Sequence, residues 1–187
     1  MAHIILFSGH MIDDPKRKES RFPPEKEPEV AAALAKLLAG EKEMTNGTIK
    51  GIASGASGGD ILFHEACQKL NIETEMYLAL PVNEFMAESV SFAGKDWEKR
   101  FDKLTEELPV HILPENKSKN KQNVWEQTNL WMLEKSIESG SENVTLIALW
   151  NMKEGDGAGG TEGMVKQAKE KGVKTITIDI TKIMEDK

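Results

Sequence analysis

Six short apolar runs alternate with helical patterns along this chain, and this alternation is the feature that most limits its fold. The runs are rich in Ile, Leu, Val and Thr, which is typical of strands buried on both faces. They cover residues 3–9, 49–54, 74–80, 109–114, 143–150 and 174–180. Because helices separate them, we expect an α/β protein: a Rossmann-like three-layer sandwich with a mostly parallel central sheet.

Five helices are expected between these strands. Glycines end three of them, and Thr161 is an expected N-cap for the last. The expected helices cover residues 29–40, 59–70, 95–108, 123–140 and 161–172. Neither a linker nor a tandem repeat interrupts the pattern, so a single domain over residues 1–187 is expected.

The charge balance limits the classes of partner. The net charge is -7 and the isoelectric point is about 5.2, which disfavours a broad contact with a phosphate backbone and makes nucleic acid an unexpected partner. No apolar run reaches the roughly 18 residues that span a bilayer. The start, MAHIILFSGHM, lacks a basic leader, so we expect a cytoplasmic protein without a membrane partner.

Three connections are longer than a compact α/β unit needs. They are residues 9–28, 81–94 and 114–122, and their order in the chain places them at the carboxyl edge of the sheet. Open parallel sheets bind ligands along this edge. The first connection carries Lys16, Arg17, Lys18 and Arg21, which would form a lid over phosphates; a plain solvated loop is the alternative.

Two glycine-rich loops, GASGGD and GDGAGGT, each follow a strand and open a helix. Glycine lets the backbone approach a ligand closely, and the amides at a helix start favour anions. The residues assigned to ligand binding are Ser54, Gly55, Ser57, Gly58, Gly59 and Asp60 in the first loop and Gly157, Gly159, Gly160 and Thr161 in the second. Paired anion sites suit a diphosphate or a nucleotide, whereas a tight strand-to-helix turn is the structural alternative.

Other polar residues complete this expected ligand site. They are Ser8, Gly9, His10, Arg21, Asn83, Glu84, Arg100 and Asn151. Asp60 is interpreted as a helix cap rather than a catalyst, and Arg100 as either a cleft residue or a surface charge. Glu65 and Glu84 are the candidate catalytic carboxylates, since no pair of nucleophile and base is evident. His64 and His111 are expected to be structural, and the histidines and Cys67 have no metal-ligand spacing.

These motifs resemble the SLOG superfamily of Rossmann-like domains, which includes the LOG phosphoribohydrolases, the DNA-processing protein A family and the amino-terminal domain of some TRPM channels. The motifs are FSGHMID with RFPP, GASGGDILFHEAC, LP-x-x-x-F with W-x-x-R-F, and LIALWNMKEGDGAGGTEGMV, and they span nearly the whole chain. The resemblance implies a nucleotide, NAD or ADP-ribose-type ligand, in a sensor or signalling domain or a hydrolase.

One departure from the LOG enzymes concerns catalysis. Those enzymes carry a catalytic glutamate three residues after the threonine of P-G-G-x-G-T-x-x-E. Here Thr161 matches, but Met164 occupies the glutamate position and Glu162 is displaced by two residues, a rotation of about 200° on a helix.

Three functions therefore stay open. The first is binding of a nucleotide-derived ligand, the second is cleavage of a nucleotide N-glycosidic bond, and the third is a protein-interaction module. For the third, Trp125 and Trp131 would form the face of a homo-oligomer, with core packing as the alternative. The sequence does not name the base, the oligomeric state or a signalling partner protein.

Overall fold

The central sheet has six parallel strands in the order β4-β3-β2-β1-β5-β6. The computed structural model describes residues 2–115, 124–153 and 160–185. The strands are β1 (His3–Gly9), β2 (Ile49–Ala53), β3 (Glu73–Leu78), β4 (Val110–Ile112), β5 (Val144–Trp150) and β6 (Lys174–Asp179). Each of the five ladders between them is parallel. The expected α/β class and Rossmann-like architecture are confirmed.

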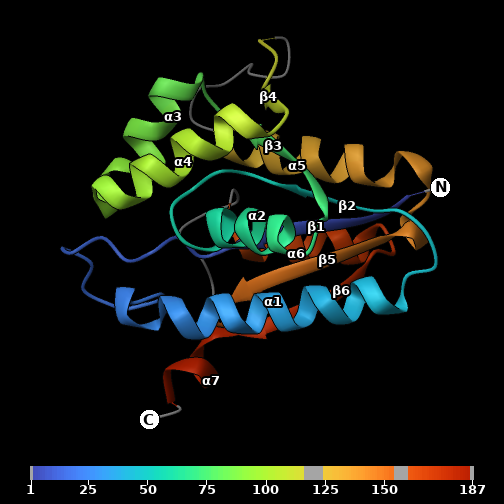
Figure 1. The fold of residues 1–187 in the computed structure, drawn as a ribbon, viewed down its shortest axis with the longest axis horizontal. Coiled ribbons are helices and arrows are strands. Elements are labelled where there is room, and N and C mark those ends of the chain that lie inside the picture. The colour runs from blue at the N-terminus through green and yellow to red at the C-terminus, as the bar shows by residue number, and fades with distance from the viewer. Residues whose placement is uncertain (1, 116–123, 154–159, 186–187) are drawn as a thin grey trace.

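Helices cover both faces of this sheet (Figure 1). The α-helices are α1 (Glu27–Met44), α2 (Gly59–Lys69), α3 (Val82–Ser89), α4 (Lys95–Glu107), α5 (Val124–Ser136), α6 (Thr161–Glu170) and α7 (Ile180–Glu185). The short 3-10 helices are η1 (Pro24–Lys26), η2 (Ser91–Ala93), η4 (Ile137–Ser139) and η5 (Ser141–Asn143). No helix in the described part of the chain combines the length and apolarity needed to cross a bilayer.

Alternate residues of each strand supply two separate cores. Ile5 and Phe7 of β1 face a core shared with α1, α2, α3, α4 and α7, whereas Leu6 faces a core shared with α5 and α6. This is the period-two alternation of strand side chains. In the sheet, β1 lies between β2 and β5. The chain runs outward from β1 through β2, β3 and β4 on one side and then returns to add β5 and β6 on the other side. The strand order therefore reverses between β1 and β5.

The structure corrects the expected connection at residues 81–94. This segment contains α3 and η2 rather than an open loop. Phe85 of α3 is buried, and its ring stacks on Phe101 of α4 at a centroid distance of 5.8 Å. The motif LP-x-x-x-F is thus the start of a helix, with Phe85 as its buried residue. Proline is tolerated at this helix start because it removes no hydrogen bond of the helix.

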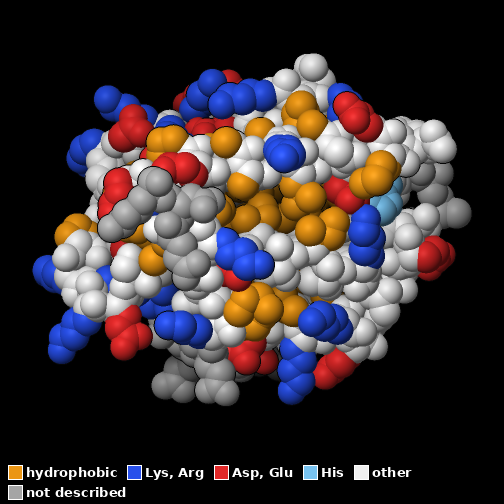
Figure 2. Space-filling model, turned by 90° about the horizontal axis from the view of Figure 1, so that it is seen from below, with side chains coloured by type: hydrophobic (Ala, Val, Ile, Leu, Met, Phe, Trp, Pro, Cys, Tyr) orange, Lys and Arg blue, Asp and Glu red, His pale blue; other side chains and the backbone are white. Residues whose placement is uncertain are grey.

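Charged side chains of both signs are interspersed on the face seen from below in Figure 2. Apolar side chains form a strip across its middle, and Lys and Arg lie beside Asp and Glu around that strip (Figure 2). A mixed surface of this kind does not attract a polyanion as a broad basic surface does.

Phe63 of α2 joins the helix layer to the centre of the sheet. Its ring is fully buried and stacks on Phe7 at 4.9 Å. It also lies over Gly51 of β2, where a Cβ atom would stand 2.9 Å from the ring. The glycine inside a strand therefore makes room for this ring.

We expect Phe63→Ala to lower the free energy of unfolding by about 3–5 kcal/mol, since it removes a ring from a fully packed site. Met44→Ala is the control, because Met44 is 68% exposed, and it should change stability by no more than about 0.5 kcal/mol. Urea denaturation followed by circular dichroism measures both. Equal stabilities of the two variants would contradict this packing.

Candidate functional site

A cavity of about 650 Å³ lies at the carboxyl edge of the sheet, beside the reversal between β1 and β5. This volume is typical of small-molecule sites, and a strand-order reversal is where open α/β sheets bind ligands. Eight residues predicted for ligand binding line it: Ser8, Gly9, His10, Arg21, Ser54, Asp60, Gly160 and Thr161. They come from the ends of β1 and β2, the segment after β1, and the starts of α2 and α6.

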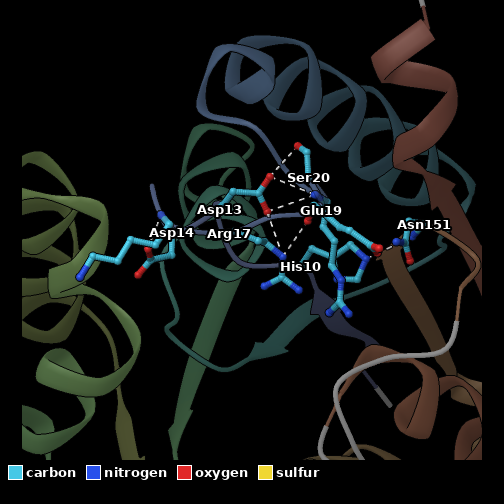
Figure 3. Close-up of polar contacts among 9 residues, drawn as sticks. His10, Asp13, Asp14, Arg17, Glu19, Ser20 and Asn151 are labelled. Carbon is cyan, nitrogen blue, oxygen red and sulfur yellow. Dashed lines mark hydrogen bonds and ion pairs between the residues drawn. The ribbon is translucent and has the colours of Figure 1, made fainter.

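Asp13 holds the segment after β1 in a fixed turn through several hydrogen bonds (Figure 3). Both of its carboxylate oxygens accept from the Arg21 amide, at 3.1 and 2.9 Å, and one accepts from the Ser20 hydroxyl at 2.7 Å. The Asp13 amide donates to the carbonyl of buried Phe22 at 2.8 Å. The segment is therefore tied down at its base, while Arg17 and Arg21 line the cavity. Whether it moves as a lid stays a prediction.

His10 connects β1 to β5 at the cavity wall. Its amide donates to the Leu149 carbonyl at 3.1 Å, and its Nε2 accepts from the Asn151 amide at 3.2 Å. Figure 3 shows the ring turned toward Asn151. Burial lowers the pKa of His10, so the neutral imidazole with its proton on Nδ1 fits this bond. Asn151, predicted as a ligand contact, lies outside the lining, and its backbone amide binds His10.

The first glycine loop packs against the segment after β1. Gly58 has a φ of 103°, and a Cβ atom there would stand 2.4 Å from the Ile12 nitrogen. The Ile12 amide donates to the Ser57 carbonyl at 3.0 Å, and the Gly59 amide donates to the His10 carbonyl at 3.0 Å. These glycines are required because two backbone segments meet here.

This packing corrects the expected phosphate cradle in the first loop. The Ser57 amide and hydroxyl both donate to the Ser89 carbonyl, at 3.0 and 3.2 Å, and the Gly59 amide is used as described above. Gly55 is buried under Met76 and Phe101, where a Cβ atom would stand 2.9 Å from each. The amides of Ser57 and Gly59, which were expected to bind a ligand, thus donate to carbonyl groups of the protein itself.

Ser54 is fixed at the end of β2 by a buried histidine. The Ser54 carbonyl accepts from Nε2 of His64 at 2.9 Å, and the other ring nitrogen meets the Thr74 hydroxyl at 2.8 Å. Burial lowers the pKa of His64 to about 4, so the ring stays neutral at physiological pH. His64 is structural, as expected.

Asp60 lies in the first turn of α2 and lines the cavity. It is 7% exposed, and its Oδ2 accepts from the Ala56 amide at 3.2 Å. Burial raises the pKa of Asp60 from its ordinary 3.8 to about 7. The carboxyl group closes the loop before α2 through this bond, but the N-cap of the helix is Gly58 and no side chain caps it, so the interpretation of Asp60 as a helix cap is wrong.

The start of α6 forms the opposite side of the cavity. Gly160 and Thr161 line it, and the Ser8 hydroxyl lies 3.4 Å from the Thr161 hydroxyl. This contact joins the end of β1 to the start of α6. Gly157 and Gly159, assigned to the same loop, lie outside the described residues.

Arg100 and Glu65, predicted as a ligand contact and a candidate catalytic carboxylate, lie outside the cavity lining. Nε and Nη2 of Arg100 bind the two oxygens of Glu65 at 2.8 and 2.7 Å, and Nη1 binds Glu27 at 2.7 Å. The guanidinium also lies 3.9 Å from the centre of the Trp97 ring. The cluster ties α1, α2 and α4 together, because a planar fork bridges carboxylates well.

Asn83 and Glu84, predicted as ligand contacts, also lie outside the cavity lining. Both are exposed on α3 and neither lines the cavity. Helix α3 turns them outward because Phe85, the next residue, faces the core.

The sequence did not assign the aromatic wall of the cavity. It consists of Phe85, Phe92, Trp125 and Trp150. The Trp125 ring lies 5.7 Å from the Phe85 ring and is 37% exposed. Trp131, proposed with Trp125 for an oligomer face, is instead buried against Tyr77 at 4.7 Å. Helical spacing alone does not show which of the two tryptophans is buried. Their partners, Tyr77 of β3 for Trp131 and Phe85 of α3 for Trp125, come from distant parts of the chain.

Comparison with known proteins gives one structural likeness. No family model matches the chain, and no curated protein is significantly similar to it. The chain is similar to the X-ray structure of DNA processing protein A from Streptococcus pneumoniae, with 13% identity and a TM-score of 0.43. The match covers 98% of this chain and 61% of that chain, so this chain spans about three fifths of that protein's length. The Rossmann-like class rests on the strand order and helix layers described above.

Gly58→Ala should lower the free energy of unfolding by about 2 kcal/mol or more, because only glycine adopts this backbone region easily and a methyl group would displace residues 10–12. Gly40→Ala is the matched control. A Cβ atom at Gly40 meets nothing within 4 Å in helix α1, so that variant should gain up to about 1 kcal/mol. Chemical denaturation compares the two, and a Gly58→Ala protein as stable as wild type would refute the close approach.

Proposed function

We propose that the cavity binds a nucleotide or a nucleotide-derived ligand of low net charge, of the ADP-ribose type. The observation that carries this proposal is the combination of an aromatic wall with arginines and a helix start in one cavity. Aromatic rings stack on bases, while arginine and helix amides bind phosphate oxygens. The resemblance to the SLOG superfamily supports it, since the motifs around Ser8–Ile12 and Gly160–Thr161 meet at this cavity.

The charges lining the cavity favour a ligand with few phosphates. Two arginines, Arg17 and Arg21, share the lining with five acidic residues: Asp14, Asp60, Glu88, Glu126 and Glu162. A triphosphate would place several negative charges among these carboxylates, and like charges repel over such distances. A diphosphate esterified at both ends carries less charge.

Calorimetric titration with ADP-ribose tests the proposal, after a thermal-shift comparison with AMP, NAD, cyclic nucleotides and ATP. We expect Arg21→Ala to weaken binding by about tenfold or more, the value of a charge-assisted hydrogen bond. The variant keeps the backbone amide that binds Asp13. Trp125→Ala should weaken binding about tenfold through lost stacking, and Trp125→Phe should restore most of it.

Lys99→Ala is the control for lost charge, because Lys99 is exposed on α4 and outside the lining. It should leave the affinity unchanged. Absence of a thermal shift and of binding heat with every compound would refute the proposed function. Equal losses in Lys99→Ala and Arg21→Ala would refute the assigned cavity.

Cleavage of an N-glycosidic bond is a second candidate, and one observation favours it. Asp60 combines burial, a raised pKa and a place in the cavity lining, which are the properties of a general acid. Against the LOG-type reaction, Met164 at the glutamate position is 1% exposed and packs in the core with α5.

If the protein cleaves its ligand, free base should appear during incubation with AMP or NAD, and Asp60→Asn should abolish this release. Mass spectrometry of the mixture detects the base directly. Intact ligand after prolonged incubation with wild type would leave binding alone as the function. The expected homo-oligomer and signalling partner stay predictions.

A further inference from the structure

Asp60 is a buried carboxyl group that lacks an ion-pair partner among the described residues. Asp60 is 7% exposed, and its Oδ2 accepts from the Ala56 amide at 3.2 Å. Arg100, by contrast, binds three carboxylate oxygens outside the cavity. Buried carboxylates are normally paired with cations or several donors, whereas Asp60 accepts from one amide and lies in the lining of a ligand-sized cavity.

Two effects oppose each other at this carboxyl group. The start of α2 favours the ionised form, by less than about one pKa unit. Burial acts in the other direction and is stronger, since it raises the pKa of Asp60 to about 7 despite the Ala56 amide. Near neutral pH a large fraction of the group is therefore an uncharged acid with one O–H donor.

The groups around Asp60 do not reverse this state. The segment after β1 brings His10, Arg17 and Arg21 to the cavity, and that histidine is neutral near pH 7 because burial lowers its pKa. The other lining elements bring carboxylates: Asp14 from the same segment, Glu88 from α3, Glu126 from α5 and Glu162 from α6. Burial is the cause that raises the pKa of Asp60, and the bond from the Ala56 amide acts against it.

We propose that Asp60 binds the ligand as the neutral carboxylic acid and donates its proton in a hydrogen bond to an anionic oxygen of the ligand. This inference rests on the proposed function and names a specificity-determining residue of the same cavity. The neutral acid offers a donor without adding a negative charge beside a phosphate. It also makes binding proton-linked, because the ionised form repels the same oxygen.

The test is calorimetric titration with ADP-ribose between about pH 6 and pH 9. The diphosphate of ADP-ribose is esterified at both ends, so the charge of this probe stays constant over that range. Wild-type affinity should be constant below the pKa of Asp60 and should fall about tenfold per pH unit above it. Asp60→Asn keeps a neutral donor, so its affinity should be independent of pH and should exceed that of wild type at high pH.

Glu88→Gln is the matched control, because it removes a carboxylate from the same cavity at an exposed position. It should keep the wild-type pH profile. A profile that flattens equally in Glu88→Gln would assign the effect to general electrostatics and overturn the inference. Wild-type affinity that is constant up to pH 9, or weak binding of Asp60→Asn at every pH, would overturn it as well.

A measurement on wild type alone does not depend on the folding of the variant. At about pH 7.5, binding should take up protons, so the observed heat should differ between buffers of different ionisation enthalpy. Proton release would show that the ligand binds the carboxylate instead. Binding without any proton exchange would overturn this inference but leave the proposed function intact, whereas no binding at any pH would overturn both.

Discussion

The close contact between the segment after β1 and the start of α2 is the constraint on which the cavity depends. The Ile12 amide binds the Ser57 carbonyl, the Gly59 amide binds the His10 carbonyl, and Gly58 removes the side chain that would separate them. This contact turns the chain back over the carboxyl edge of the sheet. It also uses backbone donors of the first glycine loop internally, so the polar groups left at the cavity come from side chains and from the start of α6.

The charges of the molecule are divided between structural and cavity roles. Arg100 joins Glu27 and Glu65 into a cluster that holds three helices together. Asp60 lacks such a partner among the described residues and lies instead at the cavity, where burial keeps it partly protonated. An arginine fork between two carboxylates satisfies every member, whereas a lone buried carboxyl group is tolerated where a ligand or a proton completes it.

Aromatic side chains line the cavity in addition to its polar groups. Phe85 anchors α3 in the core and supports Trp125 of α5 at its edge, so packing residues and cavity residues form one continuous structure. The polar side of the cavity is built on the reversal of strand order at β1, and its parts are joined by the Ser8–Thr161 contact.

The sequence by itself determined the strands, the main helices, the α/β class and the edge of the sheet that carries the cavity. Strand and helix periodicities are local properties of the chain, and parallel connection fixes which strand ends share an edge. It also identified Ser8, His10, Arg21, Asp60 and Thr161 as neighbours of one cavity. Tertiary structure alone decided that Arg100 pairs with Glu65, that Trp131 is buried while Trp125 lines the cavity, and that the first glycine loop binds protein carbonyls. These outcomes depend on contacts between residues far apart in the chain, and a local pattern of residue types holds no information about which distant partner satisfies a donor or covers a ring.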